Sequence, residues 1–248
     1  MSLKTSTNAF ISISLALLAA SDLLAADTSV PTYTASYRGS YKGRHLANAD
    51  FSVRYDAAKD LYTFESRTEP RGLLKLLRPG AAVERSDFVL RDGEIQPREY
   101  WFDPGGRNDE DDLHIVFDWD AGIARIEKQS GATELGIMPG VLDRGSMQVA
   151  VMRDMGNGGP VGPYVLIDED SLSTYVYADE GREDVETGLG DLSTLRYMQT
   201  REGSSRSLVV FAAPKLKFLP VLIEQQRRGE TETSFLLESV DGLERTDP

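Results

Sequence analysis

Residues 33–41 read YTASYRGSY, and the alternation of their side chains indicates the fold of the whole chain. Tyr33, Tyr37 and Tyr41 fall on one face of an extended segment together with an alanine and a glycine. Threonine, serine and arginine side chains take the opposite face. A period of two residues is typical of a strand in an antiparallel sheet that buries one face only. The stretch therefore predicts a strand of such a sheet.

The same pattern continues along the chain, next in 47–55, where Phe51 and Val53 alternate with Asp50 and Ser52. Period-two segments of this kind, each a few residues long and bounded by turn residues, are typical strands. The further predicted strands are 61–68, 82–90, 94–102, 113–119, 123–128, 172–179, 192–200, 206–212, 220–228 and 232–239.

Turn residues separate these segments at intervals of roughly ten residues. Asp92-Gly93 and residues 120–122 (DAG) predict two tight hairpin turns, and Gly181, Gly203 and Gly229 are expected to end strands. The fold class that follows is mainly β. We expect a large curved antiparallel sheet that forms a barrel or half-barrel.

Two segments have helical spacing, and we expect one or two short helices to cover the concave face of the sheet. Residues 142–155 form the first, with Asp143 as its N-cap and Gly156 just past its end. Residues 71–78 form the second, between two prolines. The glycine-rich stretch 156–163 reads as a loop after the first helix, so residues 27–248 are predicted to be a single β-rich domain.

The first 26 residues have the pattern of a secretory signal peptide. Lys4 precedes the apolar run 10–20 (FISISLALLAA), and small residues close the segment before Asp27. The apolar run is shorter than the roughly 20 residues that span a bilayer, and Asp22 interrupts the segment. We expect export to the periplasm as a soluble protein with no transmembrane span after cleavage. The alternative is an uncleaved N-terminal anchor.

Cleavage after Ala26 is expected to leave a protein that starts at Asp27. N-terminal sequencing of the protein from the envelope fraction checks this expectation. A full-length species in the cytosol would contradict it.

Composition excludes several classes of function. The chain has 27 Lys and Arg against 40 Asp and Glu, a net charge of −13 and an isoelectric point near 4.7. Nucleic-acid binding needs clustered basic residues, so no nucleic-acid partner is expected. The chain contains no cysteine, which removes disulfides, thiolate metal sites and catalytic thiols.

No catalytic constellation stands out, and the sequence predicts a non-enzymatic protein without cofactor or metal. The G-x-S-x-G motif is absent, and His45 and His114 are the only histidines. His114 falls on the polar face of its strand, as an isolated surface histidine would. Two acidic runs, 109–112 and 168–170, lack the spacing of a calcium loop and are interpreted as solvated loops.

Candidate ligand-binding residues come from the apolar face of the first strands and from one leucine-rich segment. The aromatic candidates are Tyr33, Tyr37, Phe51, Tyr55 and Phe64. The aliphatic candidates are Leu73, Leu74, Leu76 and Leu77, which alternate with Arg71, Lys75 and Arg78.

The leucine-rich segment has two interpretations. It could be a short helix that plugs the open end of the sheet with its leucines, which is the interpretation we favour from the sequence. It could also be a lid over an apolar cavity or a contact with a membrane surface.

Several phrases together resemble the exported bacterial family known as domain of unknown function 3108. They are residues 33–41, 143–147 (DRGSM), 186–190 (ETGLG), 210–214 (VFAAP) and 219–224 (LPVLIE). The chain departs from the family pattern at 186–190, where the usual proline is missing, and at Phe211, which stands in place of a tryptophan.

The resemblance implies an exported protein and carries over no activity and no catalytic residue. It also implies a likeness to periplasmic half-barrel proteins such as lipoprotein carriers, in which a curved sheet wraps helices and an apolar groove. Fold alone does not define function.

Two functions remain open at this point. The first is a periplasmic protein that binds an apolar or amphipathic envelope molecule, such as a lipid, in a β-cup. The second is an envelope accessory protein that acts through a protein partner and has no small-molecule ligand.

Overall fold

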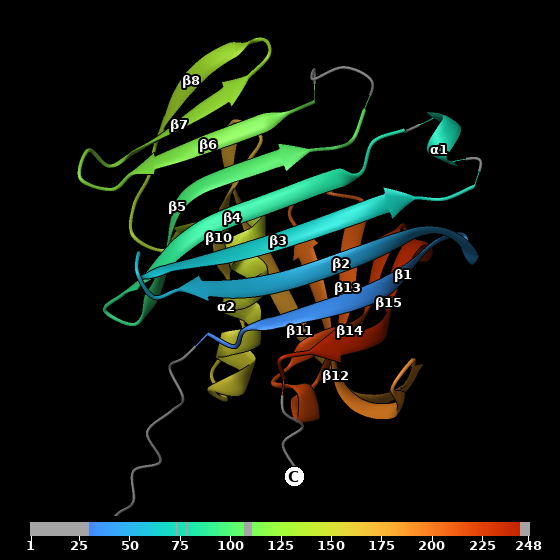
Figure 1. Ribbon diagram of the computed structural model, residues 1–248. Helices are drawn as coiled ribbons and strands as arrows, with labels where there is room; N and C mark the ends of the chain where they lie inside the picture. Colours follow the sequence, from blue (N-terminus) through green and yellow to red (C-terminus); the bar gives the residue numbers. More distant parts are fainter. Residues whose placement is uncertain (1–29, 73, 78, 107–110, 244–248) are drawn as a thin grey trace, which may run out of the picture.

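The computed structural model describes residues 30–243 apart from 73, 78 and 107–110, and it also leaves out the side chain of Leu77. Fifteen strands form one sheet (Figure 1). They are β1 (Tyr33–Tyr41), β2 (Arg44–Asp56), β3 (Leu61–Pro70), β4 (Ala82–Arg91), β5 (Glu94–Asp103), β6 (Leu113–Asp118), β7 (Ile123–Lys128), β8 (Gly131–Gly136), β9 (Val141–Leu142), β10 (Tyr164–Asp168), β11 (Ser171–Thr187), β12 (Gly190–Arg201), β13 (Arg206–Ala213), β14 (Leu219–Arg227) and β15 (Glu230–Asp241).

The order of the strands in the sheet is β8-β7-β6-β5-β4-β3-β2-β1-β15-β14-β13-β12-β11-β10-β9. Neighbours pair antiparallel throughout, except for the short parallel pair β9–β10. Each strand is thus joined mainly to its neighbour in sequence, and β1 joins β15. The prediction of a mainly β protein with a large antiparallel sheet is confirmed.

The sheet curves until its two ends meet through side chains, although its end strands β8 and β9 do not pair with each other. Val141 of β9 and Ile167 of β10 belong to a buried cluster with Tyr100, Ile115 and Ile126 of β5, β6 and β7. A sheet that has one apolar face must cover that face, and here part of the face covers another part. The result is a half-barrel.

One helix fills the concave side. Helix α2 (Arg144–Gly156) runs between the layer of β1–β6 and the layer of β11–β14 (Figure 1). Met147, Val151, Met152 and Met155 are buried there against the inner faces of the strands. Eight of its thirteen residues are buried, as expected for a helix enclosed by a sheet.

The other helices are short and lie at the ends of strands. Helix α1 (Leu74–Leu77) lies in the connection from β3 to β4, away from α2, and η1 (Pro214–Leu216) joins β13 to β14 (Figure 1). The concave face is therefore covered by one of the two predicted helices.

The start of α2 is held by a buried polar cluster. The Asp143 carboxylate accepts a hydrogen bond from Ser146 N at 2.8 Å, and Ser146 Oγ accepts one from Asp143 N at 3.0 Å. Ser86 Oγ on β4 donates to Asp143 Oδ2 at 2.8 Å. This reciprocal capping box confirms Asp143 as the N-cap. Burial raises the pKa of the Asp143 carboxyl to about 7.

Gly145 lets this first helical turn approach the sheet closely. A Cβ atom there would lie 2.8 Å from Phe64 Cδ1 and 2.8 Å from Ser86 Cβ. Packing thus explains three of the residues 143–147. Asp143 caps the helix, Gly145 lets the helix approach the sheet, and Met147 enters the core.

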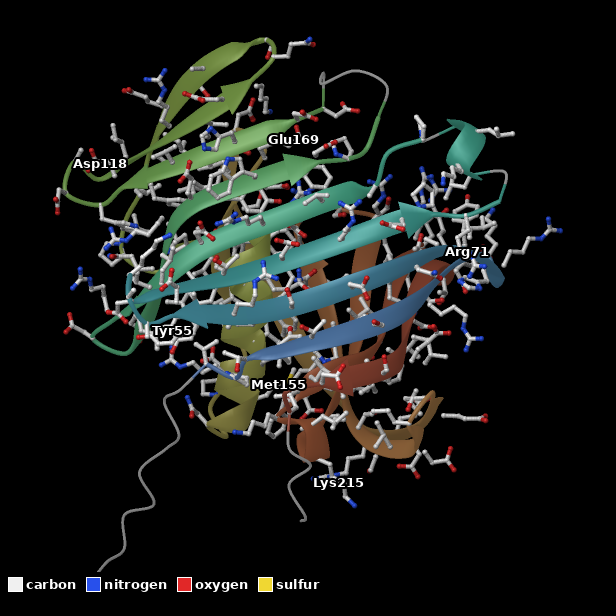
Figure 2. The ribbon with its side chains drawn as sticks, in the orientation of Figure 1. Tyr55, Arg71, Asp118, Met155, Glu169 and Lys215 are labelled. Carbon is white, nitrogen blue, oxygen red and sulfur yellow. The ribbon has the colours of Figure 1, made fainter. Side chains whose placement is uncertain are left out.

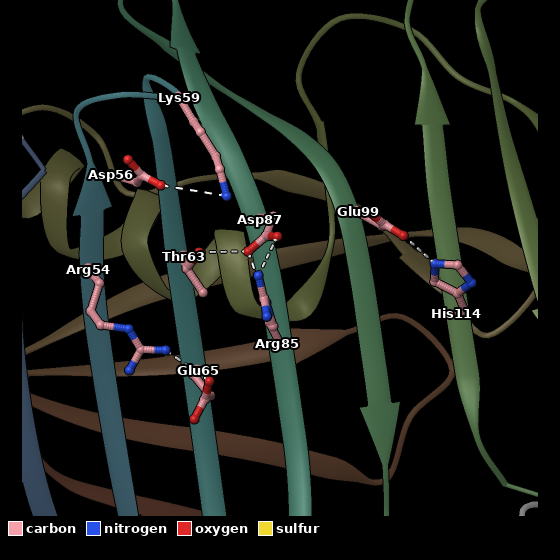
Figure 3. Close-up of polar contacts among 9 residues, drawn as sticks. All are labelled: Arg54, Asp56, Lys59, Thr63, Glu65, Arg85, Asp87, Glu99 and His114. Atoms are coloured by element: carbon pink, nitrogen blue, oxygen red, sulfur yellow. Dashed lines mark hydrogen bonds and ion pairs between the residues drawn. The ribbon is translucent and has the colours of Figure 1, made fainter.

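Polar contacts follow the outer face of the sheet (Figure 3). The Arg85 guanidinium donates twice to Asp87, which also accepts from Thr63, and Arg54 pairs with Glu65 at 2.9 Å. Exposed pairs of this kind contribute only about 0–1 kcal/mol each. Their effect is to keep the convex side polar.

His114 is not an isolated surface histidine, and in this respect the prediction was wrong. Its ring is half-buried and lies 2.8 Å from Glu99 (Figure 3). It also lies 3.2 Å from Glu127 and stacks on Trp101 at a centroid distance of 5.3 Å. The cause is cross-strand pairing, which sets β5 and β7 on either side of β6. The prediction that His114 lies on the polar face of its strand was right.

Other differences concern element boundaries. Strands β8, β9 and β10 were not predicted, and Leu142 lies in β9 instead of in the helix. Gly181 does not end a strand: β11 continues through it with a register shift between Asp179 and Arg182. A glycine inside a strand pattern often marks such a bulge. Strand β8 lacks apolar alternation because it is an edge strand, with nearly all its residues exposed.

Candidate functional site

A cavity of about 500 Å³ lies between α2 and the inner faces of β11–β15. Its apolar wall includes Val210, Ile223 and Phe235, which are cross-strand neighbours on β13, β14 and β15. Met147 and Val151 of α2 form the opposite wall. Antiparallel pairing brings these side chains together because residues opposite each other on adjacent strands point to the same face.

Tyr177 and Gln199 line the cavity side by side. Gln199 Nε2 donates to the Tyr177 hydroxyl at 2.6 Å and lies 3.6 Å from Met147 Sδ. Tyr177 packs edge-on against Tyr164 at a centroid distance of 5.7 Å. Burial raises the pKa of the Tyr177 hydroxyl well above its usual range, so it stays protonated. The cavity thus offers neutral hydrogen-bonding groups within an aromatic wall.

Charged groups gather where β10, β11 and β12 end or begin. Asp168 at the end of β10 forms an ion pair with Arg201 and lies 3.4 Å from Arg144 Nη2. It also accepts a hydrogen bond from the Tyr175 hydroxyl at 3.3 Å. Arg144 is the first residue of α2, so the helix and two strands all contribute to this polar end of the cavity.

A half-buried carboxyl lies beside this polar end. Glu84 on β4 accepts a hydrogen bond from the Tyr100 hydroxyl at 2.7 Å and also lines the cavity. Burial raises the pKa of Glu84, while the Tyr100 hydroxyl and the Arg144 charge favour its ionised form. Arg144 therefore interacts with two acidic groups, Asp168 and Glu84.

Of the predicted aromatic ligand residues, the structure brings only Phe51 to this cavity. Tyr33, Tyr37 and Phe64 are almost fully buried in the core. The Tyr33 hydroxyl lies 3.7 Å from Met152 Sδ of α2, and the Tyr37 hydroxyl donates to Pro220 O at 2.8 Å. These three side chains face the concave side, as predicted, but α2 and neighbouring strands cover them.

Tyr55 lies elsewhere. It is 43 % exposed near the far end of β2, and its hydroxyl donates to Asp60 at 2.8 Å (Figure 2). The period-two pattern placed it on the same face as Phe51, but the strand extends past the covered part of the sheet.

The leucine-rich segment does not plug the sheet at the positions that the structure describes. Leu76 is 66 % exposed and Leu74 is half-buried. Leu73 and the side chain of Leu77 lie outside the described residues. Since α2 already fills the concave side, no place is left there for α1. The favoured plug interpretation is wrong for Leu76.

The sequence did not indicate the charged end of the cavity. Residues 168–170 were interpreted as a solvated loop, whereas the Asp168 side chain is only 17 % exposed and contacts two arginines. Tyr175 and Tyr177 lie two residues apart in a predicted strand and therefore share a face. This spacing was the signal in the sequence for the aromatic wall of the cavity. The other acidic run, 109–112, lies partly outside the described residues.

Within the described ranges, no group of three or more histidine, aspartate or glutamate side chains is arranged to hold a metal ion. In the same part of the chain, no helix combines the length and apolar character needed to cross a membrane.

The fold and the cavity define a class: a β-barrel-like protein whose curved sheet encloses one helix and a cavity beside it. A sequence model of the family "Protein of unknown function (DUF3108)" matches residues 32–232. The chain belongs to this family, and the resemblance seen in its motifs is confirmed.

A solved structure with a TM-score above 0.5 has a similar fold. A beta-barrel-like protein of the domain of unknown function DUF1849 from Brucella abortus is similar, with a TM-score of 0.55, 9 % identity, and coverage of 88 % of this chain and 99 % of that chain. A "putative lipoprotein" from Parabacteroides distasonis matches with a TM-score of 0.36, 10 % identity, and coverage of 85 % and 95 %. No curated protein matches this chain.

Proposed function

We propose that this protein is a non-enzymatic, exported periplasmic protein that binds an amphipathic molecule of the cell envelope in the cavity beside α2. The apolar part of the ligand lies against Val210, Ile223 and Phe235, and its polar end lies near Asp168 and Arg201. The observation that carries the proposal is the cavity itself, with an apolar wall and a charged end.

The dimensions and lining support this function. Cavities that hold small molecules typically measure about 300–1,000 Å³ and combine apolar walls with a few polar groups. The cavity here, about 500 Å³, has this composition. The His114 ring, a potential general base, lies on the outer face among Glu99, Glu127 and Trp101, away from the cavity. The proposed function is binding, without a catalytic step.

Two measurements test the proposal. Native mass spectrometry of the protein from the envelope fraction is expected to show a bound molecule that is released by lipid extraction. The purified chain is also expected to bind 11-(dansylamino)undecanoic acid, a fluorescent probe with an apolar chain and a carboxylate. Binding would be measured by fluorescence titration in solution without vesicles.

A cavity-filling substitution makes the test specific. Val210→Trp is expected to weaken probe binding by at least about tenfold, or about 1.4 kcal/mol. The matched control is Val116→Trp on the outer face of β6, where the valine is 37 % exposed, and this variant should bind like the wild type. Circular dichroism would verify that both variants fold. Absence of probe binding and of any co-purified molecule, or equal binding by both variants, would favour the accessory protein without a small-molecule ligand.

A further inference from the structure

The connection from β3 to β4 forms a projecting tip at one end of the sheet. Helix α1 projects there, and Arg71 lies at its base (Figures 1 and 2). Arg71 N donates to Leu46 O at 2.7 Å, and the Arg71 guanidinium donates to Asn48 at 3.3 Å. The segment is therefore fastened to the start of β2, next to the turn between β1 and β2.

This tip combines exposed apolar and basic side chains. Leu76 is 66 % exposed, and Tyr41 at the end of β1 is 47 % exposed. Lys42, Arg44, Arg71 and Lys75 are all exposed as well. Together, Tyr41, Lys42, Arg44, Arg71, Lys75 and Leu76 are called the basic tip below.

The charge of the basic tip contrasts with that of the whole chain. The chain has a net charge of −13, yet four exposed basic side chains, those of Lys42, Arg44, Arg71 and Lys75, lie at this end of β1–β3. Among the residues that the structure describes, no carboxylate lies within ion-pair distance of Lys42, Arg44, Arg71 or Lys75. By comparison, arginines along the outer face pair with acidic neighbours, as Arg54 does with Glu65. The basic tip is thus an unneutralised positive patch with a leucine at its apex.

We propose that the basic tip docks on an anionic lipid surface. Basic side chains near such a surface are attracted to the headgroups, and a neighbouring apolar side chain can enter the boundary of the acyl chains. A single exposed leucine would be ordinary, but its position among four basic groups without an ion pair points to lipid as the partner.

The topology places the polar end of the cavity at the same end of the sheet as the basic tip. Three antiparallel pairs show this. Tyr41 at the end of β1 pairs with Thr233 near the start of β15, and Arg227 at the end of β14 pairs with Arg206 at the start of β13. Arg201 at the end of β12 pairs with Tyr175 near the start of β11. Asp168 and Arg201, at the polar end of the cavity, therefore lie at the end of the sheet that carries the basic tip. Docking would turn the polar end of the cavity toward the lipid surface. The docking itself does not depend on the cavity's being occupied.

A site-specific label tests the docking. Because the chain has no cysteine, Leu76→Cys can be labelled alone with the environment-sensitive fluorophore NBD. Met138→Cys is the matched control, since Met138 is also 66 % exposed and follows β8 at the opposite end of the sheet. Addition of vesicles of phosphatidylglycerol and phosphatidylcholine should raise and blue-shift the emission of the label at 76 and leave the label at 138 unchanged. Pure phosphatidylcholine vesicles should change neither.

The contribution of charge is measured in the same assay. In the labelled Leu76→Cys chain, Lys75→Gln should weaken binding to the anionic vesicles about fivefold, because one basic residue near the surface contributes about that factor. Lys215→Gln, an exposed lysine at the opposite end, should have no effect (Figure 2). Raising the salt from about 0.1 M to about 1 M should release the protein, since the Debye length falls from about 10 Å to about 3 Å.

Three results would overturn the docking proposal: no response of the label at 76, equal responses at 76 and 138, or equal effects of the two lysine substitutions. Failure of the cavity proposal is distinguished by the dansyl probe, which is titrated without vesicles. The Lys75→Gln variant should bind that probe like the wild type.

Discussion

Asp143→Ala is expected to lower the free energy of unfolding by about 3 kcal/mol at pH 5. Loss of an N-cap side chain costs about 1 kcal/mol, and leaving buried hydrogen-bonding groups unsatisfied adds about 1–3 kcal/mol. Here the groups are the Ser86 hydroxyl and the Ser146 amide, both in fully buried residues. Urea unfolding followed by circular dichroism measures the change.

Asp143→Asn is the control for geometry and charge. Its amide oxygen can accept from Ser146 N, and its amide nitrogen can donate to Ser86 Oγ, so both contacts of the carboxyl have a counterpart. Asparagine is as good an N-cap as aspartate. At pH 5 this variant is expected to be close to the wild type in stability. A loss as large as that of the alanine variant would contradict the assignment of these hydrogen bonds.

A comparison of the wild type with Asp143→Asn also tests the ionisation of Asp143. Burial raises its folded pKa to about 7, while an unfolded aspartate titrates near about 3.9. The folded state therefore retains a proton that the unfolded state loses, and the contribution of this group to stability falls as the pH rises from about 4 through about 7. Asp143→Asn removes this contribution, so its stability relative to the wild type should increase from pH 5 to pH 8.

Glu84 has a raised pKa too, from burial, and it remains in both proteins. The expected result is therefore the difference between the two pH profiles, measured by urea unfolding at each pH. Parallel profiles would show that Asp143 titrates alike in the folded and unfolded chains.

Gly188→Ala is expected to destabilise the protein by about 3 kcal/mol, because the added methyl group has no space. Gly188 lies in the turn between β11 and β12, where its amide donates to Leu237 O on β15 at 2.9 Å. A Cβ atom would lie 2.3 Å from Glu238 O and 2.7 Å from Glu238 Cα. Both are backbone atoms of a paired strand, so they cannot move aside as a flexible side chain could.

Gly136→Ala in β8 is the matched control. No atom other than those of its chain neighbours lies within 4 Å of the Cβ position there, and the backbone has no positive φ. Its midpoint of urea unfolding should stay close to that of the wild type, while that of Gly188→Ala falls. Equal midpoints for the two variants would contradict the close approach of the turn to β15.

Local signals in the sequence were sufficient for much of the sheet. Strands β1 and β7 have the predicted bounds, and β4 and β5 extend one residue beyond theirs, joined at the predicted Asp92-Gly93 turn. Asp143 was predicted as the N-cap of α2 because aspartate is a preferred residue at that position. These features depend on a residue and its near neighbours along the chain: alternation defines a face, a turn needs particular residues, and a cap acts within one helical turn.

Local signals failed where the partner was distant. β9 has two residues and pairs with β10, and neither was predicted, because the pairing joins segments on either side of α2. Gly181 was expected to end a strand, but pairing with β12 carries β11 past it. Such pairing cannot be read from one segment alone.

By itself, the sequence determined which side chains share a face, and hence that this protein is a curved sheet with an apolar inner side. Only the tertiary structure decided what covers that side. Helix α2 buries Tyr33 and Phe64, leaves Phe51 at a cavity, and leaves α1 outside with Leu76 exposed. The physical reason is that periodicity records the preference of a face for burial, whereas the burying partner is selected by packing between segments far apart in the chain.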